Sequence, residues 1–446
     1  MRKKIVIFGS ILILGLAKLV MAQVWERIIP SGTPPDKRNG HVLIQQFVFG
    51  GFDQDNDLWI LREEGGGNWR WEYVAVKGTA PFSRGGHSGI FAYDLNNSII
   101  IFGGSEDFEG VLVDSATYKL EDSWSWNPTW EKLETIGTAP SSRAEHTAVY
   151  DESEKMMVVF GGYTSTEPVV GVSSETYTLN LGVSPPAKWA KLDTDEEIPA
   201  RYGHSAVRGG MEMMVFGGKD NLGNLLDECW ELDLQGNKWT KISVTGNKPP
   251  ARWQHTAVWI WGEQGEEMII FGGEDEDENP LNDVWVLQRP PGEPWKWEEI
   301  YPIGDLPSGR TGHAAASGGD GEGKIFIFGG FDGNNNLNDV YAFFKGEKVE
   351  ETLQEKPFNA PNPFNPDTEE TKICYYLDED DDVKIKLFTL TGDLVYSWEN
   401  ISGRKGLNQW PWNGKNEKGR IVENGGYICL IEAGGEKQKC KIAVLR

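Results

Sequence analysis

The feature that most constrains this chain is a motif that returns six times between residues 38 and 330. Each copy contains Arg-x-x-His followed by Phe-Gly-Gly, and successive Phe-Gly-Gly groups lie 53 to 58 residues apart. All six histidines of the chain belong to these copies. A side chain that recurs once per structural unit serves that unit, so we expect structural roles for these residues, as strand-start residues that hold neighbouring loops. The pairs are Arg38/His41, Arg84/His87, Arg143/His146, Arg201/His204, Arg252/His255 and Arg310/His313.

Each copy predicts four β-strands. The residues before Phe-Gly-Gly are apolar at consecutive positions, as in "NSIIIFGG", which indicates a strand covered on both faces. The two glycines suit a backbone that a side chain would not fit. An alternating strand such as "DVWVLQ" follows, and then a strand with one tryptophan that lies 12 or 13 residues before the next arginine. These tryptophans are Trp25, Trp71, Trp130, Trp189, Trp239 and Trp297.

The pattern resembles the kelch repeat over residues 24 to about 345, and the resemblance implies an all-β fold, a six-bladed β-propeller. No tryptophan strand follows the sixth copy, whereas the first one, "VWERIIP", has no copy before it. We therefore expect the N-terminal strand to complete the sixth blade and close the ring without an open edge. In the first copy only "HVLIQQFVF" joins His41 to Phe49, which predicts a clipped first hairpin.

Residues 1–22 have the parts of a secretory signal peptide. A basic start precedes an apolar run, and small residues at Val20-Met21-Ala22 suit cleavage after Ala22. Lys18 leaves the run short of the ~20 residues that a membrane helix needs. We expect a secreted or cell-surface protein that is exported through a cleaved signal and has no membrane span afterwards.

The net charge of −25 argues against nucleic acid or anionic lipid as partners. Acidic loops such as "FDQDND", "EDEDENP" and "DEDDD" do not match the spacing of an EF-hand. We interpret them as solvated loops, with loop-bound calcium as the alternative. One histidine per copy keeps the imidazoles apart, so the sequence predicts no metal site and no cofactor.

The tail has a different composition. Residues 346–366, rich in proline and asparagine, predict a linker, and residues 367–446 predict a small β-sandwich of short strands. The segments "PNPFNP", "VKIKLFTLTGDLV", "WNGKNEKGRIVENGGYICLIEAGG" and "KCKIAVLR" resemble the Ig-like domain of flagellar hook-capping proteins and the C-terminal sorting domains of type IX secretion. The resemblance implies an Ig-like module that an export machinery recognises. The alternative is a passive spacer domain.

Four cysteines are too few for a disulfide scaffold. Cys429 and Cys440 flank "EAGGEK" and lie opposite each other if Gly434-Gly435 is the turn of a hairpin. An oxidised pair and two reduced core thiols both fit this spacing.

Kelch-like propellers commonly bind with one face, built from the loops after Phe-Gly-Gly and the loops that enter Arg-x-x-His. Aromatic side chains around a channel mouth suit sugar rings or a peptide, and the alternative is that they pack between loops. Carried over by position, the resemblance implies the candidate ligand-binding residues Phe52, Tyr163, Tyr202, Lys219, Trp253, Glu274 and Phe331, with the motif arginines nearby.

The sequence favours a binding or interaction module for an extracellular protein or glycan, without a catalytic residue. One alternative is a carbohydrate-active enzyme, since some kelch-like propellers oxidise galactose or interconvert sialic acid anomers. A copper oxidase is disfavoured because no histidine is spare, which leaves acid/base chemistry by Glu145, Glu274 and the motif arginines. A structural component of the cell envelope is the third interpretation.

Overall fold

The computed structural model divides the chain into two compact units, a repeat unit of Gln23–Gly346 and a C-terminal unit that contains Glu347–Arg446. Most of the expected signal peptide and the middle of the expected linker lie outside the described residues. The structure describes residues 21–52, 56–106, 112–113, 115–125, 127–166, 169–195, 198–262, 265–289, 292–318, 323–348, 357–360, 362–367, 370–377, 380–404 and 406–446.

The described residues form strands and no helix, which confirms the all-β class predicted from the sequence. Within the same residues, no helix offers the length and apolar character needed to cross a bilayer.

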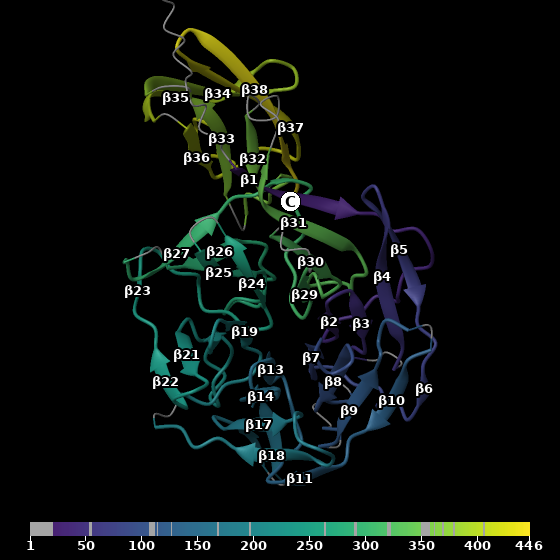
Figure 1. The fold of residues 1–446 in the computed structure, drawn as a ribbon. Coiled ribbons are helices and arrows are strands. Elements are labelled where there is room, and N and C mark those ends of the chain that lie inside the picture. The colour runs from purple at the N-terminus through teal and green to yellow at the C-terminus, as the bar shows by residue number, and fades with distance from the viewer. Residues whose placement is uncertain are drawn as a thin grey trace, which may run out of the picture. The chain divides into compact units, whose positions relative to one another are not determined.

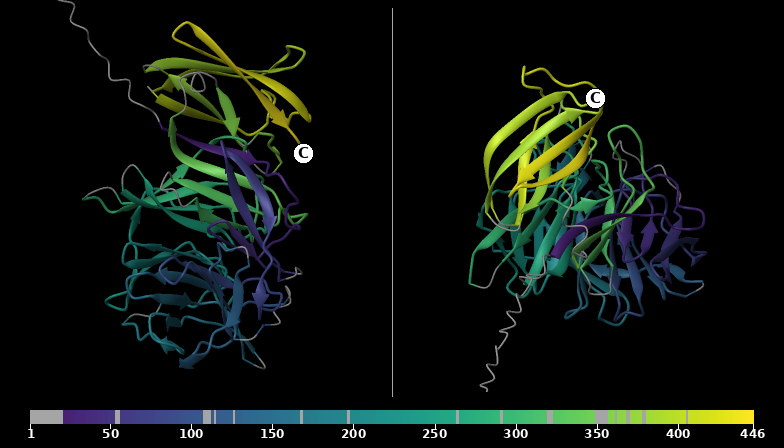
Figure 2. Two further views of the ribbon diagram at one scale, coloured as in Figure 1. Left: turned by 45° about the vertical axis from the view of Figure 1, so that its right-hand side comes forward. Right: turned by 90° about the horizontal axis from the view of Figure 1, so that it is seen from above.

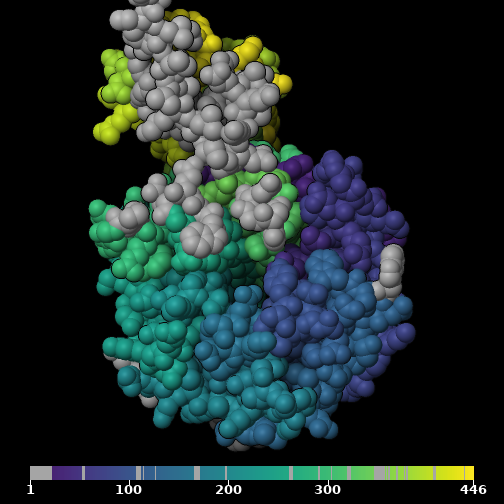
Figure 3. All heavy atoms as spheres, in the orientation of Figure 1, coloured from purple at the N-terminus to yellow at the C-terminus, as the bar shows by residue number. Residues whose placement is uncertain are grey.

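The repeat unit contains six sheets of four or five strands in the described residues, one for each copy of the motif. Figure 1 shows them around a common centre, with β2, β7, β13, β19, β24 and β29 innermost. The colours of Figure 3 follow the chain around this unit in order, from purple through blue and teal to green.

We number the sheets one to six by their motif and give the strands in spatial order. Sheet one is β2 (Val42–Ile44), β3 (Phe47–Phe49), β4 (Leu58–Gly65) and β5 (Asn68–Tyr73). Sheet two is β7 (Ser88–Ala92), β8 (Ser98–Phe102), β9 (Thr117–Glu121), β10 (Thr129–Lys132) and β6 (Lys77–Gly78). Sheet three is β13 (Thr147–Asp151), β14 (Met156–Phe160), β17 (Thr176–Asn180), β18 (Ala187–Lys191) and β11 (Thr135–Gly137).

Sheet four is β19 (Ser205–Gly209), β20 (Glu212–Phe216), β21 (Cys229–Asp233) and β22 (Lys238–Lys241). Sheet five is β24 (Thr256–Gly262), β25 (Gly265–Phe271), β26 (Val284–Gln288), β27 (Trp295–Ile300) and β23 (Val244–Thr245). Sheet six is β29 (Ala314–Ser317), β30 (Lys324–Phe328), β31 (Val340–Lys348), β1 (Met21–Ile28) and β28 (Ile303–Gly304). A small extra sheet joins β12 (Arg143–Ala144), β15 (Tyr163–Thr166) and β16 (Val169–Val172).

The apolar run before Phe-Gly-Gly is buried on both faces, as the sequence predicts. All five residues of β8 are buried. Ile99 and Ile101 belong to a core cluster shared with sheet one, whereas Ile100 and Phe102 belong to a cluster shared with sheet three. Successive side chains of a strand point to opposite faces, so an apolar residue at every position supplies two cores at once.

The six repeat tryptophans join each sheet to the one before it. Each is at most 3% exposed, and its ring lies 4.9 to 5.3 Å from the Phe-Gly-Gly phenylalanine of the preceding sheet. Trp25 of β1 packs on Phe271 of sheet five in the same way, and β1 lies between β28 and β31 in sheet six. The first tryptophan strand therefore occupies the place that the tryptophan strands of the other sheets occupy.

The motif arginines are fully buried and fasten each Phe-Gly-Gly turn. The guanidinium of Arg38 donates to the carbonyl of Gly50, and the N–H of Gly51 donates to the carbonyl of Arg84 in the next sheet. The same two bonds recur in every sheet, and in the sixth the N–H of Gly330 donates back to Arg38. In sheets one, five and six an aspartate carboxylate also accepts from both terminal nitrogens of the guanidinium group, as Asp57 does with Arg38.

Sheet one has the clipped hairpin that the sequence predicts. Its strands β2 and β3 have three residues each, whereas the corresponding hairpin of sheet two has five in each strand. Gln45, in the two-residue turn between β2 and β3, adopts a φ of 57°.

The C-terminal unit contains two sheets that share one core cluster, and Figure 2 shows them as separate layers of ribbons. One sheet is β32 (Phe358–Ala360), β33 (Thr371–Leu377) and β36 (Gly406–Trp412). The other is β35 (Leu394–Gly403), β34 (Asp381–Thr389), β37 (Gly425–Ala433) and β38 (Glu436–Val444).

The expectation of a linker does not hold for the described residues 357–360 and 362–366. Phe358–Ala360 pairs with β33, and Phe364 is 1% exposed within the core of the C-terminal unit. Proline and asparagine limit pairing, but they do not prevent Phe364 from burying apolar surface. These residues therefore belong to the C-terminal unit.

Cys429 and Cys440 lie opposite each other in β37 and β38, with Gly434 and Gly435 at the turn. The predicted register is confirmed. Both thiols are free in this structure, and the contact with Cys440 together with burial raises the pKa of the Cys429 thiol.

The tryptophan packing leads to a matched test. Trp25 and Trp297 are each at most 2% exposed, and both lie 5.0 Å from a phenylalanine ring. We expect Trp25→Ala and Trp297→Ala to lower the free energy of unfolding equally, by about 3 to 5 kcal/mol. Urea denaturation followed by circular dichroism measures both. Deleting residues 23–30 should destabilise the whole repeat unit, and unchanged melting of that variant would contradict an integral β1.

Candidate functional site

A closed cycle of six backbone hydrogen bonds lies at the centre of the repeat unit. The third residue of each Arg-x-x-His motif donates its N–H to the carbonyl of the third residue in the preceding sheet. The N···O distances are 2.7 to 3.0 Å, and the cycle closes because Gly40 of sheet one donates to Gly312 of sheet six. The members are Gly40, Gly86, Glu145, Gly203, Gln254 and Gly312.

All six members have the left-handed backbone conformation, with φ between 49° and 64°. Glycine adopts this conformation without strain and fills four of the positions. Glu145 and Gln254 are the exceptions, and the conformation costs a residue with a side chain about 1 to 2 kcal/mol. Strain of this kind in a structure is a reason to look for a function at the residues that carry it.

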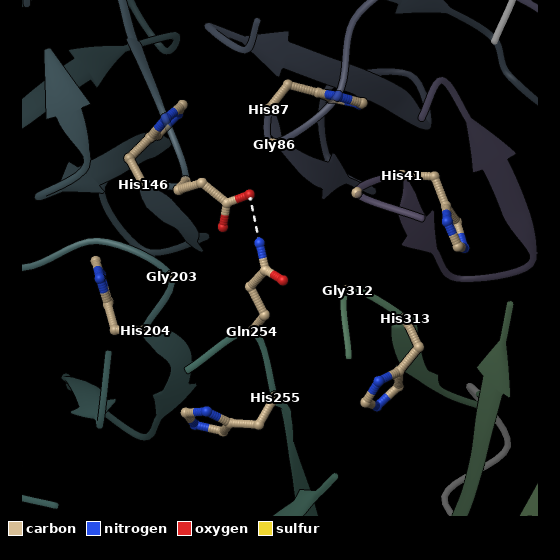
Figure 4. Close-up of a pocket in the computed structure, with 12 residues that line it drawn as sticks. His41, Gly86, His87, His146, Gly203, His204, Gln254, His255, Gly312 and His313 are labelled. Atoms are coloured by element: carbon tan, nitrogen blue, oxygen red, sulfur yellow. Dashed lines mark hydrogen bonds between the residues drawn. The ribbon is translucent and has the colours of Figure 1, made fainter. Parts of the chain in front are cut away.

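The side chains of Glu145 and Gln254 meet across the central cavity. Nε2 of Gln254 donates to Oε1 of Glu145 at 3.1 Å, and Figure 4 draws this bond. Oε1 of Gln254 accepts from the hydroxyl of Thr311 at 3.0 Å, which fixes the orientation of the amide. The cavity has a volume of about 120 Å³ and is lined by the six members of the cycle and the six histidines. A polar chain from three different sheets therefore orients one carboxylate in the cavity.

The histidines line the cavity without pointing into its centre. Figure 4 shows each imidazole directed around the ring toward the preceding sheet. In four of them Nε2 lies 2.8 Å from a serine or threonine hydroxyl of that sheet. Each of the six rings also packs edge-on against the Phe-Gly-Gly phenylalanine of the preceding sheet. The hydroxyls belong to the residue after the histidine, which is Val42 in sheet one and Ala314 in sheet six. His87 and His41 therefore have no such partner.

The six imidazoles are neutral at physiological pH. Burial, followed by the nearby Arg84, lowers the pKa of His87 to about 3. Burial, followed by the arginine of the same motif, holds the pKa of the other five well below 6.5. The histidine lining thus adds hydrogen bonds and packing to the cavity, but no positive charge.

The pKa of Glu145 is raised, whereas those of the histidines are lowered. Burial raises the pKa of Glu145 to about 7, although the hydrogen bond from Gln254 and the ammonium of Lys219 act against this shift. A carboxyl group with a pKa near neutrality is half protonated in physiological solution, and such groups are common in binding and catalytic sites.

The candidate ligand-binding residues come from positions that pair through the backbone. The residue after the motif arginine faces the residue after Gly-Gly, as in the bridge between Tyr202 and Lys219 and the bridge between Trp253 and Glu274. In sheet three the same pairing extends into the small sheet, where Ala144 faces Tyr163. The structure thus joins the residues after Gly-Gly to the residues after the motif arginines, sheet by sheet.

Five of the predicted residues lie together over sheets three to five. The rings of Tyr163 and Tyr202 lie 5.9 Å apart, and those of Tyr202 and Trp253 lie 6.0 Å apart, each pair edge-to-face. Nζ of Lys219 lies 3.3 Å from the centre of the Trp253 ring, and Nε1 of Trp253 donates to Glu274 at 2.8 Å. We call this half-buried group of Tyr163, Tyr202, Lys219, Trp253 and Glu274 the mouth cluster.

The mouth cluster adjoins the cavity. A Cβ atom on Gly203 would lie 2.9 Å from the Trp253 ring and 3.6 Å from Oε2 of Glu145. The charge of Glu145 also raises the pKa of Tyr202, after the larger effect of burial. Gly203, which lines the cavity, therefore lies between the Trp253 ring of the mouth cluster and the carboxylate of Glu145.

The expectation for Phe52 is wrong, and Phe331 and the motif arginines are not part of the mouth cluster. Phe52 is 4% exposed, because its ring fills the space over Gly40 and Gly85. Phe331 is half-buried and bonds through its backbone to Thr311, so its role as a ligand-binding residue stays a prediction. The motif arginines are fully buried against carbonyl and carboxylate groups within the sheets, so they supply no charge to a ligand.

The sequence reasoning did not single out Gln254 and named Glu145 only as part of an enzymatic alternative. A signal was present: the residue before the motif histidine is glycine in four copies and a long polar residue in these two. Among the described residues, no group of three or more His, Cys, Asp or Glu side chains is arranged to hold a metal ion.

Two models of known protein families match this chain. A family model described as the KLHDC2/KLHL20/DRC7 Kelch-repeats domain matches residues 125–264 and 203–363, which together cover more than half of the chain. This chain belongs to the kelch-repeat family. A second family model, the Attractin/LZTR1 beta-propeller, matches residues 17–184 of this kelch protein.

Similar kelch proteins occur in animals. Kelch domain-containing protein 2 from Bos taurus is 26% identical over 334 residues, which cover 67% of this chain and 77% of that protein. The Rab9 effector protein with kelch motifs from Bos taurus is 29% identical over 221 residues, 48% of this chain and 55% of that protein. Host cell factor homolog hcf-1 from Caenorhabditis elegans is 26% identical over 68% of this chain. The match spans only 41% of hcf-1, so this kelch protein corresponds to part of such relatives.

Among solved structures, that of YjhT is similar, with a TM-score of 0.50 and 15% identity. The likeness covers 72% of this chain and 99% of the other. At this identity it supports the fold alone.

The neutral histidines predict loss of stability in mild acid. Their folded-state pKa values are lowered, so below pH 6.5 the unfolded chain binds more protons than the folded kelch unit. Stability should therefore fall as the pH falls from 6.5, by up to about 1.4 kcal/mol per pH unit for each histidine. Glu145, whose pKa is raised to about 7, binds a proton in the folded state between about pH 4.5 and about 7. It therefore offsets the effect of one histidine in this range.

His87→Asn is the variant that tests this. Below pH 6.5, it should reduce by about one the number of protons taken up on unfolding, and so lower the slope of the unfolding free energy against pH. Urea denaturation at several pH values measures this slope. The C-terminal unit contains no histidine and serves as the internal control. A slope that the substitution leaves unchanged would contradict a neutral buried His87.

Proposed function

We propose that this chain is a secreted or cell-surface kelch propeller that binds an extracellular protein or glycan through the mouth cluster. The observation that carries the proposal is the contiguous aromatic and charged surface over sheets three to five. Tyr163, Tyr202 and Trp253 are half-buried, so part of the surface of each side chain is available to a ligand. Large aromatic side chains contribute strongly to binding energy when a ligand covers them.

We infer that the six sheets are the six blades of a propeller that the N-terminal strand closes. The inference is supported by the cycle of six backbone bonds, by the return of Gly330 to Arg38 and by the packing of Trp25 on Phe271. A closed ring leaves no open sheet edge and holds the loops at its mouth in fixed positions. Such a frame suits a binding site built from variable loops.

The C-terminal unit is proposed to be an Ig-like sorting-type domain that an export machinery recognises. Its two sheets, its single core and the sequence likeness to exported modules support this proposal. The kelch relatives include a protein named as a Rab9 effector, and this name favours interaction over catalysis as the role of the repeat unit.

A second candidate function is acid/base chemistry on a carbohydrate. Glu145 favours it, because a carboxyl group with a pKa of about 7 can both donate and accept a proton near neutrality. The buried motif arginines take no part in this version. Turnover of a bound sugar would support this candidate, and binding without turnover would support the first.

The binding proposal is tested with the full chain on glycan and peptide arrays. We expect Trp253→Ala and Tyr202→Ala to weaken binding of a captured ligand by about tenfold or more, as substitutions of central aromatic residues do at interfaces. Tyr73→Ala is the control, because Tyr73 is 56% exposed on β5, the outermost strand of sheet one. If both mouth variants keep full binding and an unchanged fold, the mouth cluster is not the binding site. Silence of the native chain on every array would favour a structural component of the envelope.

A further inference from the structure

We propose that the channel mouth binds the ammonium group of a lysine side chain from a partner protein, with the Glu145 carboxylate as its counter-ion. This inference rests on the proposed function and deepens it by naming the group that the mouth recognises. Four independent features of the structure support it.

The first feature is the replacement of glycine at two positions of the central cycle. Glu145 and Gln254 keep the left-handed conformation that glycine adopts in the other four sheets. Their side chains do not serve the cycle, whose bonds are made by the backbone alone. The chain from Thr311 through Gln254 holds the carboxylate of Glu145 in the cavity, as a group that positions a binding residue does.

The second feature is an unused oxygen. Oε1 of Glu145 accepts the bond from Gln254, whereas Oε2 accepts no hydrogen bond from any residue that the structure describes. Oε2 lies on the side of Gly203 and the Trp253 ring, at the boundary between the cavity and the mouth cluster. An ionised carboxylate accepts bonds at both oxygens, so one oxygen remains for a donor that enters from the mouth.

The third feature is the balance of charge. The described residues that line the cavity are glycines, neutral histidines, Gln254 and Glu145, so the ionised carboxylate has no counter-charge within the lining. Lys219 is the nearby cation, but Nζ of Lys219 lies over the Trp253 ring and 4.0 Å from Oε1 of Glu274. Glu274 therefore offsets Lys219, and a positively charged ligand group would offset Glu145. The contact of Lys219 with Trp253 also demonstrates that this ring accepts an ammonium group.

The fourth feature is size. The cavity of about 120 Å³ is well below the several hundred cubic ångströms of a typical small-molecule site. It accommodates the narrow end of an aminobutyl chain more readily than a sugar ring. A lysine side chain that passes the edges of Tyr202 and Trp253 would bring its apolar stem against aromatic rings and its charge to Glu145, as amphipathic side chains do.

Binding tests use the full chain and two small probes, Nα-acetyl-lysine methylamide and its norleucine counterpart, which has no ammonium group. We expect the lysine probe to bind at least about tenfold more tightly in ligand-observed NMR, because only it supplies a charge for Glu145. Equal affinity for the two probes would overturn the proposal.

The pH dependence provides a second readout. The charged and titratable groups that face Glu145 are Lys219, Tyr202 and the six histidines. Burial lowers the pKa of Lys219 from its usual value near 10.5, whereas the pKa of Tyr202 is raised and those of the six histidines are lowered, both away from 7. Lysine-probe affinity should therefore rise about tenfold from about pH 6 to about pH 8 as Glu145 ionises, and should then level off. A flat profile for the lysine probe in the folded protein would contradict the assignment.

Variants separate binding from a purely structural role. Glu145→Gly restores the residue found at this position in four other sheets and relieves the left-handed strain, so we expect the melting temperature to stay or rise while lysine-probe binding is lost. A fall in melting temperature with unchanged probe binding would make Glu145 a structural bridge and overturn the proposal. Glu145→Gln, which keeps the shape and an acceptor, should also lose the pH dependence.

Lys219→Met distinguishes a cation from an anion as the ligand. The positive charge of Lys219 repels the ammonium group of the probe, so its removal should tighten lysine-probe binding severalfold, whereas a site for anions would lose affinity. If Trp253→Ala abolishes binding of an array ligand and Glu145→Gly does not, the proposed function stands and the lysine assignment falls. If neither substitution affects it, the proposed function falls as well.

Discussion

The cycle of six backbone hydrogen bonds at the centre of the repeat unit is the constraint on which the other features depend. Each bond requires a left-handed residue directly before the motif histidine, and each links neighbouring sheets at their innermost point. The cycle sets the position of every innermost strand relative to the next. Farther from the centre, neighbouring sheets are also joined by the bonds from the Phe-Gly-Gly turns to the motif arginines and by the packing of tryptophan on phenylalanine.

The scaffold removes charge from the channel. Six histidines line the cavity, but burial and the adjacent arginines keep them neutral, and the arginines themselves are buried and hydrogen-bonded inside the sheets. A single carboxylate at Glu145 is therefore conspicuous in its surroundings. In a partly enclosed environment with few competing charges, one such group has a larger electrostatic effect than it would have on an open surface.

Much of the fold could be predicted from the sequence, because each structural position is stated six times. The consecutive apolar residues of β8, the spacing of the tryptophans and the unmatched Trp25 strand all carry local information about burial and pairing. The errors occurred where position in the motif did not determine exposure. Phe52 follows Gly-Gly like Tyr163, yet it is buried because Gly40 and Gly85 leave a space that its ring fills. The segment around Phe364 contains prolines like a linker, yet its phenylalanine is part of a core.

The sequence by itself determined the kelch repeat, the strands and the residues that hold the sheets together, since these depend on periodicity and on apolar patterning along the chain. Only the tertiary structure decided which variable residues act together. Glu145 and Gln254 are separated by 109 positions and belong to sheets that are not neighbours in the ring, yet their side chains bond across the cavity. The physical reason is closure: six copies of one motif position converge on a common centre, and a side chain there meets partners that no spacing in the sequence identifies.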